Sequence, residues 1–60
     1  MKVYFIPRWS QQYKMWMVFR ESAIINYNDT EIENVPAIAE FYNYIDAMNF
    51  AINYTKEFNQ

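Results

Sequence analysis

The chain has 60 residues, a net charge of −2, and no cysteine, histidine or glycine. It therefore cannot form disulfides or thiolate metal sites, it lacks the commonest metal ligand and proton carrier, and it has no glycine-rich loop to hold a phosphate. We expect one small domain, residues 1–60, that is not an enzyme and has no cofactor, no metal site and no small-molecule substrate.

Two strands joined in a hairpin are predicted at the start of the chain, over residues 2–8 and 13–20. Both stretches are rich in β-branched and aromatic residues. Pro7 cannot donate to a strand ladder, so the first strand lies at a sheet edge or ends there. The connection has about four residues, since no Asn-Gly or Asp-Gly pair is present for a two-residue turn. Without glycine, turns that need a positive φ are expected to use Asn or Asp.

The second predicted strand, YKMWMVFR, is apolar on both sides. Alternate side chains point to opposite faces of a sheet. One set is Tyr13, Met15, Met17 and Phe19, and the other is Lys14, Trp16, Val18 and Arg20. A strand with one solvent-exposed face would alternate apolar with polar residues. Both faces of this strand therefore need cover.

The middle of the chain, residues 21–43, is acidic. Residues 23–27 could form a third strand, and the sequence NDTEIEN that follows is expected to form an exposed acidic turn. Asp29, Glu31 and Glu33 lie close together there, and carboxylate oxygens bind hard cations. Their spacing does not match a calcium-binding loop, so we interpret them as a solvated loop rather than as a cation site.

Two interpretations remain open from Pro36 onward. In the first, one long helix begins at Pro36. Its apolar residues would recur at helical spacing: Ile38, Phe41, Ile45, Met48 and Ile52. In the second, residues 38–42 form a short strand and a helix follows over residues 44–58, with Asn43 as its cap and Asp46 three residues further on. The weak helix formers around Asn43 and the capping signal favour the second interpretation.

Small residues on the final helix indicate which face of the sheet it covers. Ala47 and Ala51 lie one turn apart and leave room for a ring, and Trp16 is our candidate for that ring, with Val18 beside it. We therefore expect an α+β fold: a small antiparallel sheet, made of the N-terminal hairpin plus one or two further strands, with one C-terminal helix packed on one face. The aromatic content of 22% suits a dense core.

The other face of the second strand would then be open, and we predict that it is an interface. The residues expected to bind a protein partner are Tyr13, Met15, Met17 and Phe19. Together they could expose about 400–600 Å², as much as the largest apolar patches on monomers. A second copy of the chain, giving a homo-oligomer, or a different protein would cover them. The alternative is that residues 23–27 or 38–42 fold back over this face.

Basic and acidic residues are concentrated in different parts of the chain. Residues 1–20 carry four basic side chains and no acid, while residues 21–60 carry seven acids against Lys56, so the charges of the two parts are +4 and −6. As an alternative function, the basic and aromatic hairpin could bind nucleic acid, with rings on bases and cations on phosphates. Those cations are Lys2, Arg8, Lys14 and Arg20. The simpler interpretation is that the opposite charges favour contacts within or between subunits.

A further alternative is that the acids imitate phosphates and inhibit a nucleic-acid-binding protein. The residues that could form such a surface are Glu21, Asp29, Glu31, Glu33, Glu40 and Asp46. Seven acids in 60 residues is an ordinary density, so this interpretation ranks below the other two.

Location and source are indicated only broadly. No apolar run approaches the roughly 18–20 residues of a membrane span. The first ten residues lack the apolar middle and cleavage site of a signal peptide, so we expect a cytoplasmic protein with no membrane partner. Small size and abundant Asn, Ile, Tyr, Phe and Lys fit a bacterial or phage accessory protein. The expected function is that of a non-enzymatic interaction module.

Overall fold

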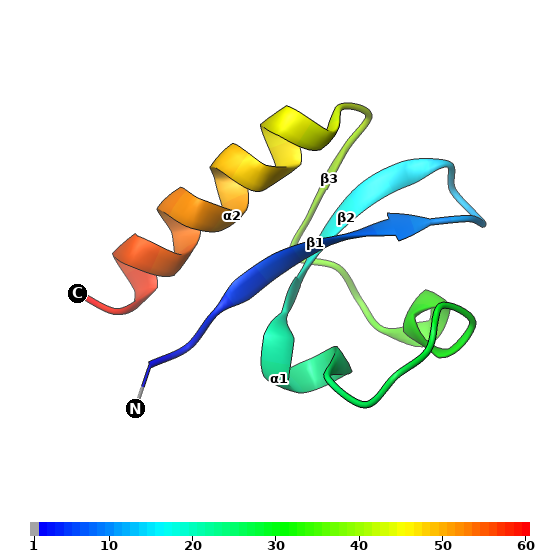
Figure 1. Ribbon diagram of the computed structural model, residues 1–60, viewed down its shortest axis with the longest axis horizontal. Helices are drawn as coiled ribbons and strands as arrows, with labels where there is room; N and C mark the ends of the chain where they lie inside the picture. Colours follow the sequence, from blue (N-terminus) through cyan, green and yellow to red (C-terminus); the bar gives the residue numbers. More distant parts are fainter. Residues whose placement is uncertain (1) are drawn as a thin grey trace.

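An antiparallel sheet and one long helix form the framework of the computed structural model, which describes residues 2–60. The strands are β1 (Phe5–Ser10), β2 (Met15–Arg20) and β3 (Ala39–Phe41), in the order β1-β2-β3. A one-turn helix α1 (Glu21–Ile24) and a 3₁₀ helix η1 (Glu31–Asn34) lie between β2 and β3, and helix α2 (Tyr44–Phe58) follows. Figure 1 shows α2 on one side of the sheet and α1 with η1 on the other. The predicted α+β class, hairpin and C-terminal helix are confirmed.

The strand-then-helix interpretation of the region after Pro36 is confirmed, and the single long helix is wrong. Asn43 has extended backbone angles, and its side-chain Oδ1 accepts a hydrogen bond of 2.8 Å from the Ile45 N–H. This bond satisfies one of the free donors of the first turn of α2. Helix α2 therefore begins where the capping signal placed it.

We expect Asn43→Ala to destabilise the protein by about 1 kcal/mol, because the Ile45 N–H loses its partner. Asn43→Ser keeps a side-chain acceptor at the cap and should remain within a few tenths of a kcal/mol of the native chain. Urea unfolding followed by circular dichroism would measure both. Equal loss in the two variants would show that the cap oxygen does not stabilise α2.

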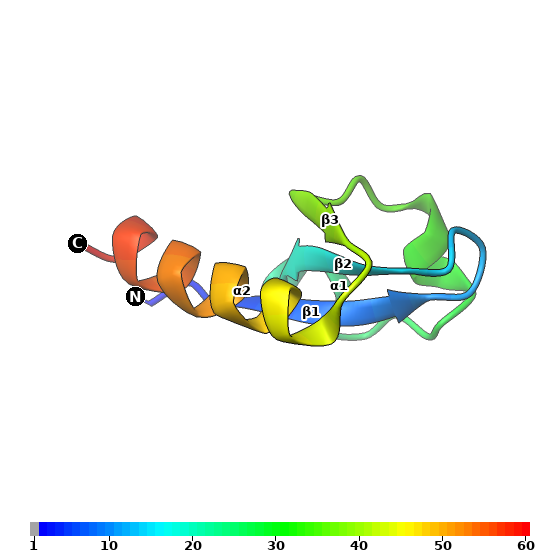
Figure 2. The same ribbon diagram turned by 90° about the horizontal axis from the view of Figure 1, so that it is seen from above.

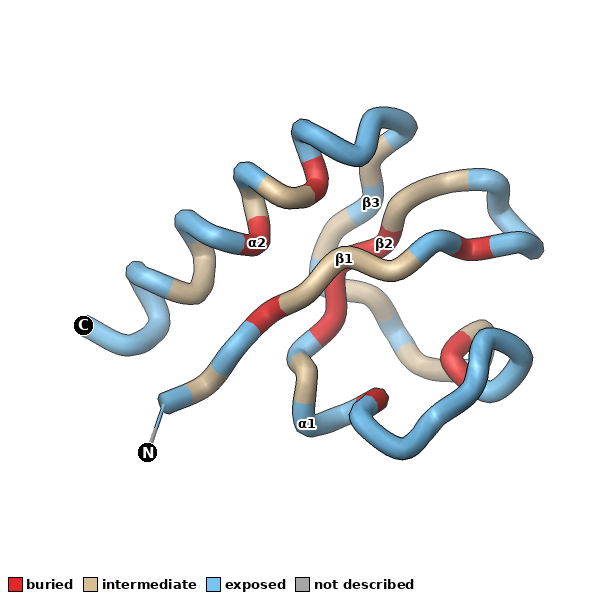
Figure 3. Tube along the Cα trace, viewed as in Figure 1, coloured by how far each residue is buried: buried red, intermediate tan, exposed pale blue. Residues whose placement is uncertain are grey.

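The core between the sheet and α2 is built as the alanine spacing predicts. Val18, Ala47 and Ala51 are buried together, and Trp16 packs against them. The Trp16 ring also meets the Tyr44 ring edge-on, with centroids 4.6 Å apart. In Figure 3 the buried positions of α2 lie on its side toward the sheet.

The expectation that the second face of β2 is open is wrong. Met17 and Phe19 are buried, and they form a second core cluster with Ile24 and Ile32, which come from α1 and η1. Partly buried Ile6, Val35 and Ala37 pack around this cluster. The chain itself supplies the cover, so the middle of β2 is covered on both faces within one subunit.

Residues 23–27 do not form the third strand that their composition predicts. The chain turns into α1 directly after β2, and this turn directs Ile24 under the sheet toward Phe19. Burial of Ile24 in the second core cluster therefore outweighs the local preference for an extended backbone. The third strand is β3, within the alternative range 38–42.

The hairpin turn also differs from expectation. The connection has the expected four residues, but it spans residues 11–14 and not 9–12 as the strands predicted over 2–8 and 13–20 imply. Trp9 and Ser10 belong to β1, and Tyr13 and Lys14 belong to the turn. The residue with positive φ is Lys14, at 56°, and not an Asn or Asp. Its N–H donates to the Ser10 carbonyl over 2.8 Å, which closes the hairpin. Closing the hairpin in this way places a residue other than glycine in the left-handed region, at a cost of about 1–2 kcal/mol.

Both edge strands of the sheet are protected from pairing with another strand, but the protection of β1 covers only part of its length. Asn59 holds the start of β1 by two hydrogen bonds, from the Val3 N–H to Oδ1 and from Nδ2 to the Val3 carbonyl. The Phe5 N–H donates to the Thr55 hydroxyl of α2, and Pro7 has no N–H to offer. At the other edge, β3 is short and carries the exposed Glu40. Figure 2 shows the three strands side by side, with α2 on the side of β1.

Candidate interaction surfaces

The residues predicted to bind a protein partner are not gathered on an open surface. Met17 and Phe19 lie in the core, Met15 is partly buried, and Tyr13 is exposed but lies in the hairpin turn. Met17 and Tyr13 line an open pocket of about 450 Å³ beside η1, but a partner could reach Phe19, which is 2% exposed, only if residues 21–38 moved away. The apolar strand thus stabilises the subunit rather than forming its outer surface.

The four hairpin cations are also dispersed. Arg8 is paired with Asp29 at 2.6 Å, while Arg20 lies over the Phe58 ring at 5.7 Å from its centroid. Strand register places these two arginines on opposite faces of the sheet, since Arg8 pairs with Met17 and Arg20 with Phe5. Lys14 lies at the hairpin turn and Lys2 precedes β1. Because Arg8 and Arg20 lie on opposite faces, the sheet brings these two cations to no common basic surface for a duplex.

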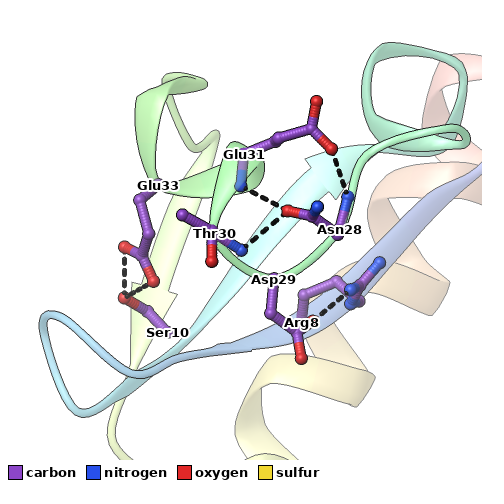
Figure 4. Close-up of polar contacts among 7 residues, drawn as sticks. All are labelled: Arg8, Ser10, Asn28, Asp29, Thr30, Glu31 and Glu33. Atoms are coloured by element: carbon purple, nitrogen blue, oxygen red, sulfur yellow. Dashed lines mark hydrogen bonds and ion pairs between the residues drawn. The ribbon is translucent and has the colours of Figure 1, made fainter.

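The acidic middle segment is fastened to the hairpin by its carboxylates. Glu33 accepts hydrogen bonds from the Ser10 hydroxyl at 3.0 and 3.3 Å, and Asp29 pairs with Arg8 (Figure 4). Ser10 is buried, and its oxygen also accepts from the Tyr13 N–H, so the hydroxyl is satisfied as donor and acceptor. These contacts hold η1 under the sheet.

A reciprocal cap orders the turn before η1. The Asn28 side-chain oxygen accepts from the N–H groups of Thr30 and Glu31, and the Glu31 carboxylate accepts from the Asn28 N–H (Figure 4). This is the arrangement of a capping box. Within residues 2–60, no group of three or more carboxylates could hold a metal ion. The clustered acids have structural partners, and Glu21, Glu40 and Asp46 lie on three different elements.

A groove of about 740 Å³ runs along the part of β1 that α2 leaves uncovered. Pro7, Trp9 and Trp16 line it on the helix side of the sheet. Arg8, Asp29 and Glu33 line it on the η1 side. Trp9 is 39% exposed, although its ring meets Trp16 edge-on at 5.4 Å. The groove is large enough for several side chains of a ligand.

A second exposed surface, which we call the α2 stripe, consists of Ile45, Met48 and Ile52. The spacing of three and four residues places them on one side of α2, about 110° around the helix from Ala47 and Ala51 at about 100° per residue. Ile45 is 66% exposed, Ile52 is 47% exposed, and Met48 between them is half-buried. Helix α2 therefore has an apolar surface that is wider than the part packed on the sheet, and the α2 stripe is its uncovered part.

Comparison of the chain with protein-family models, curated proteins and solved structures gives no match. Across residues 2–60, no helix has both the length and the apolar character needed to cross a membrane. Fold analogy therefore carries no functional argument, and any function has to be inferred from the surfaces themselves. We argue function from two of these surfaces, the α2 stripe and the groove along β1.

The helical spacing of Ile45, Met48 and Ile52 in the sequence is a signal for the α2 stripe. The interpretation with one long helix combines these residues with Ile38 and Phe41 in a single helical pattern. The structure separates the two groups, because the turn at Asn43 breaks the periodicity. Phe41 packs inward from β3, while Ile45 and Ile52 are exposed.

Proposed function

We propose that the chain is a non-enzymatic interaction module that self-associates through the α2 stripe. The observation that carries this proposal is the exposure of Ile45 and Ile52 on a side of α2 that lies about 110° around the helix from its buried alanines. Apolar side chains that extend beyond the packed face of a helix are more stable in water when a partner covers them. A second copy of the chain is the partner that best fits the ends of the stripe.

The two ends of the stripe complement each other. Lys56 lies one turn beyond Ile52 on the same side of α2, and Tyr42, 84% exposed, precedes the helix at the other end. If two copies of α2 pack antiparallel with Met48 near the centre, Ile45 of each copy meets Ile52 of the other. Lys56 of each copy then lies beside the Tyr42 ring of the other, where a cation–π contact is favourable. Self-complementarity of this kind is what a two-fold interface requires.

The contact is small, so we expect a weak dimer. Two turns of helix and the adjacent tyrosine cover far less than the roughly 800 Å² that each partner buries in a standard interface. Light scattering should therefore show a molar mass that rises from 7.4 kDa toward twice that value as the protein concentration is raised.

Ile45→Lys should weaken this dimer by at least about tenfold, because each dimer loses two buried isoleucines and gains two like charges. Ile25→Lys is the matched control. Ile25 has the same exposure of 66% but follows α1, on the other side of the sheet. We expect the control to associate as the native chain does. A native chain that stays at 7.4 kDa at every concentration, or equal dissociation in both variants, would refute self-association through α2.

A further inference from the structure

We propose that the groove beside Trp9 binds an extended peptide of alternating apolar and basic residues, which adds to β1 as a fourth strand. This site is separate from the α2 stripe, and it holds whether or not the chain dimerises. It combines an open length of strand edge, an exposed indole and an excess of negative charge.

The strand edge is open at Trp9. The Glu21 N–H donates to the Tyr4 carbonyl, so the backbone groups of Tyr4 face the β2 side. Backbone groups alternate in direction along a strand, so every second residue from Tyr4 forms hydrogen bonds with β2. The residues between them, which include Phe5 and Trp9, direct their N–H and carbonyl groups away from β2. Phe5 is already bonded by Thr55, and Pro7 has no N–H. In the described chain, no neighbouring segment bonds the outward N–H and carbonyl of Trp9. An added strand would find one complete pair of backbone partners there.

The two walls of the groove require different side chains from the ligand. Trp9 lies on the helix side, where an apolar side chain of the ligand would cover the indole. The next side chain of an extended ligand points to the η1 side, toward Glu33. Alternation of apolar and polar residues in the ligand follows from this geometry.

The net charge on the η1 side of the groove predicts that the polar side chains of the peptide are basic. On the η1 side, one cation, Arg8, faces two carboxylates, Asp29 and Glu33, which leaves one negative charge. Arg8 is paired with Asp29. Glu33 is hydrogen-bonded by Ser10 and by the Gln12 N–H, and within residues 2–60 it pairs with no cation. A lysine or arginine of the ligand would neutralise it.

The experiment uses the capped peptide Val-Lys-Val-Lys-Val and follows the Trp9 backbone and indole signals by NMR as peptide is added. We expect saturable shifts centred on Trp9. The peptide Val-Glu-Val-Glu-Val should bind at least tenfold more weakly. Val-Val-Lys-Lys-Val should also bind more weakly, because it has the same composition but places a lysine on the Trp9 side.

Backbone pairing is tested with N-methyl peptides. In an antiparallel pair, the residue opposite Trp9 has its side chain on the same face and donates its N–H to the Trp9 carbonyl. N-methylation of the central valine should therefore abolish binding. The N–H of each lysine points to solvent, so N-methylation of a lysine should preserve most of the affinity of the peptide. Equal effects of the two methyl groups would overturn the added strand.

A protein variant tests the charge. Glu33→Gln keeps an oxygen that can accept from Ser10, and it should bind the lysine peptide three- to tenfold more weakly; Glu57→Gln, on α2, is the control and should bind as the native chain does. No saturable shift with any peptide, or full affinity in Glu33→Gln, would overturn the proposal. Loss of native self-association in Trp9→Ala, without peptide binding by the native chain, would show that the groove holds a second copy instead.

Discussion

Replacing Ile32 by alanine is expected to destabilise the folded chain by about 2–5 kcal/mol, the usual cost of removing a buried isoleucine side chain beyond Cβ. Ile32 is 2% exposed, and it packs with Met17, Phe19 and Ile24 on the η1 side of the sheet. At about 0.05–0.15 kcal/mol per residue, a chain of this length has little stability to lose. Urea unfolding should show a large fall in the midpoint, and the variant could be partly unfolded in buffer.

Ile25→Ala is the matched control for this substitution. Ile25 directly follows α1 and is largely exposed, so the same loss of atoms should change the free energy of unfolding by less than about 0.5 kcal/mol. Similar small effects in both variants would mean that η1 does not seal the sheet. The face that carries Met17 and Phe19 would then again be available to a partner.

Signals from short stretches of the sequence were sufficient to predict the framework of the fold. Asn43 predicted the start of α2 because a capping side chain acts on backbone groups within three residues. The spacing of Ala47 and Ala51 predicted where Trp16 and Val18 pack, because one helical turn fixes their separation. Pro7 predicted an edge strand, since it lacks the donor that a central strand needs. Each of these depends on a few neighbouring residues.

The cover on the second face could not be predicted in the same way. Ile24 and Ile32 have no helical or strand periodicity between them, because the segment that joins them is mostly irregular. Its position depends on contacts with residues far away in the sequence, above all those of Glu33 with Ser10 and Asp29 with Arg8. The apolar residues of β2 predict that both faces need cover, and the alternative that residues 23–27 fold back over the second face is confirmed for Ile24, whereas no local signal identified Ile32 as part of the cover.

The division of charge along the chain has a related explanation. The basic hairpin and the acidic middle segment are separate in sequence, which suggested a cationic surface for nucleic acid. In the folded chain Asp29 lies against Arg8, so part of each charge is compensated across the two segments. Because ion pairing depends on the tertiary fold, the sign of the net charge of a segment does not predict the electrostatic potential of the surface on which the segment lies.

Replacing Ala51 by leucine should destabilise the chain by about 1–3 kcal/mol, because the added atoms have no space between α2 and the sheet. Ala51 is 1% exposed and is buried with Phe5 and Val18. Alanine and leucine have nearly the same helix propensity, so the loss reports packing and not the stability of the helix alone. Ala23→Leu, at an exposed position of α1, should change stability by less than about 0.5 kcal/mol in the same urea titration. If Ala51→Leu were tolerated equally well, α2 would have to be loosely seated on the sheet, and its orientation, including the outward direction of Ile45 and Ile52, would no longer be fixed.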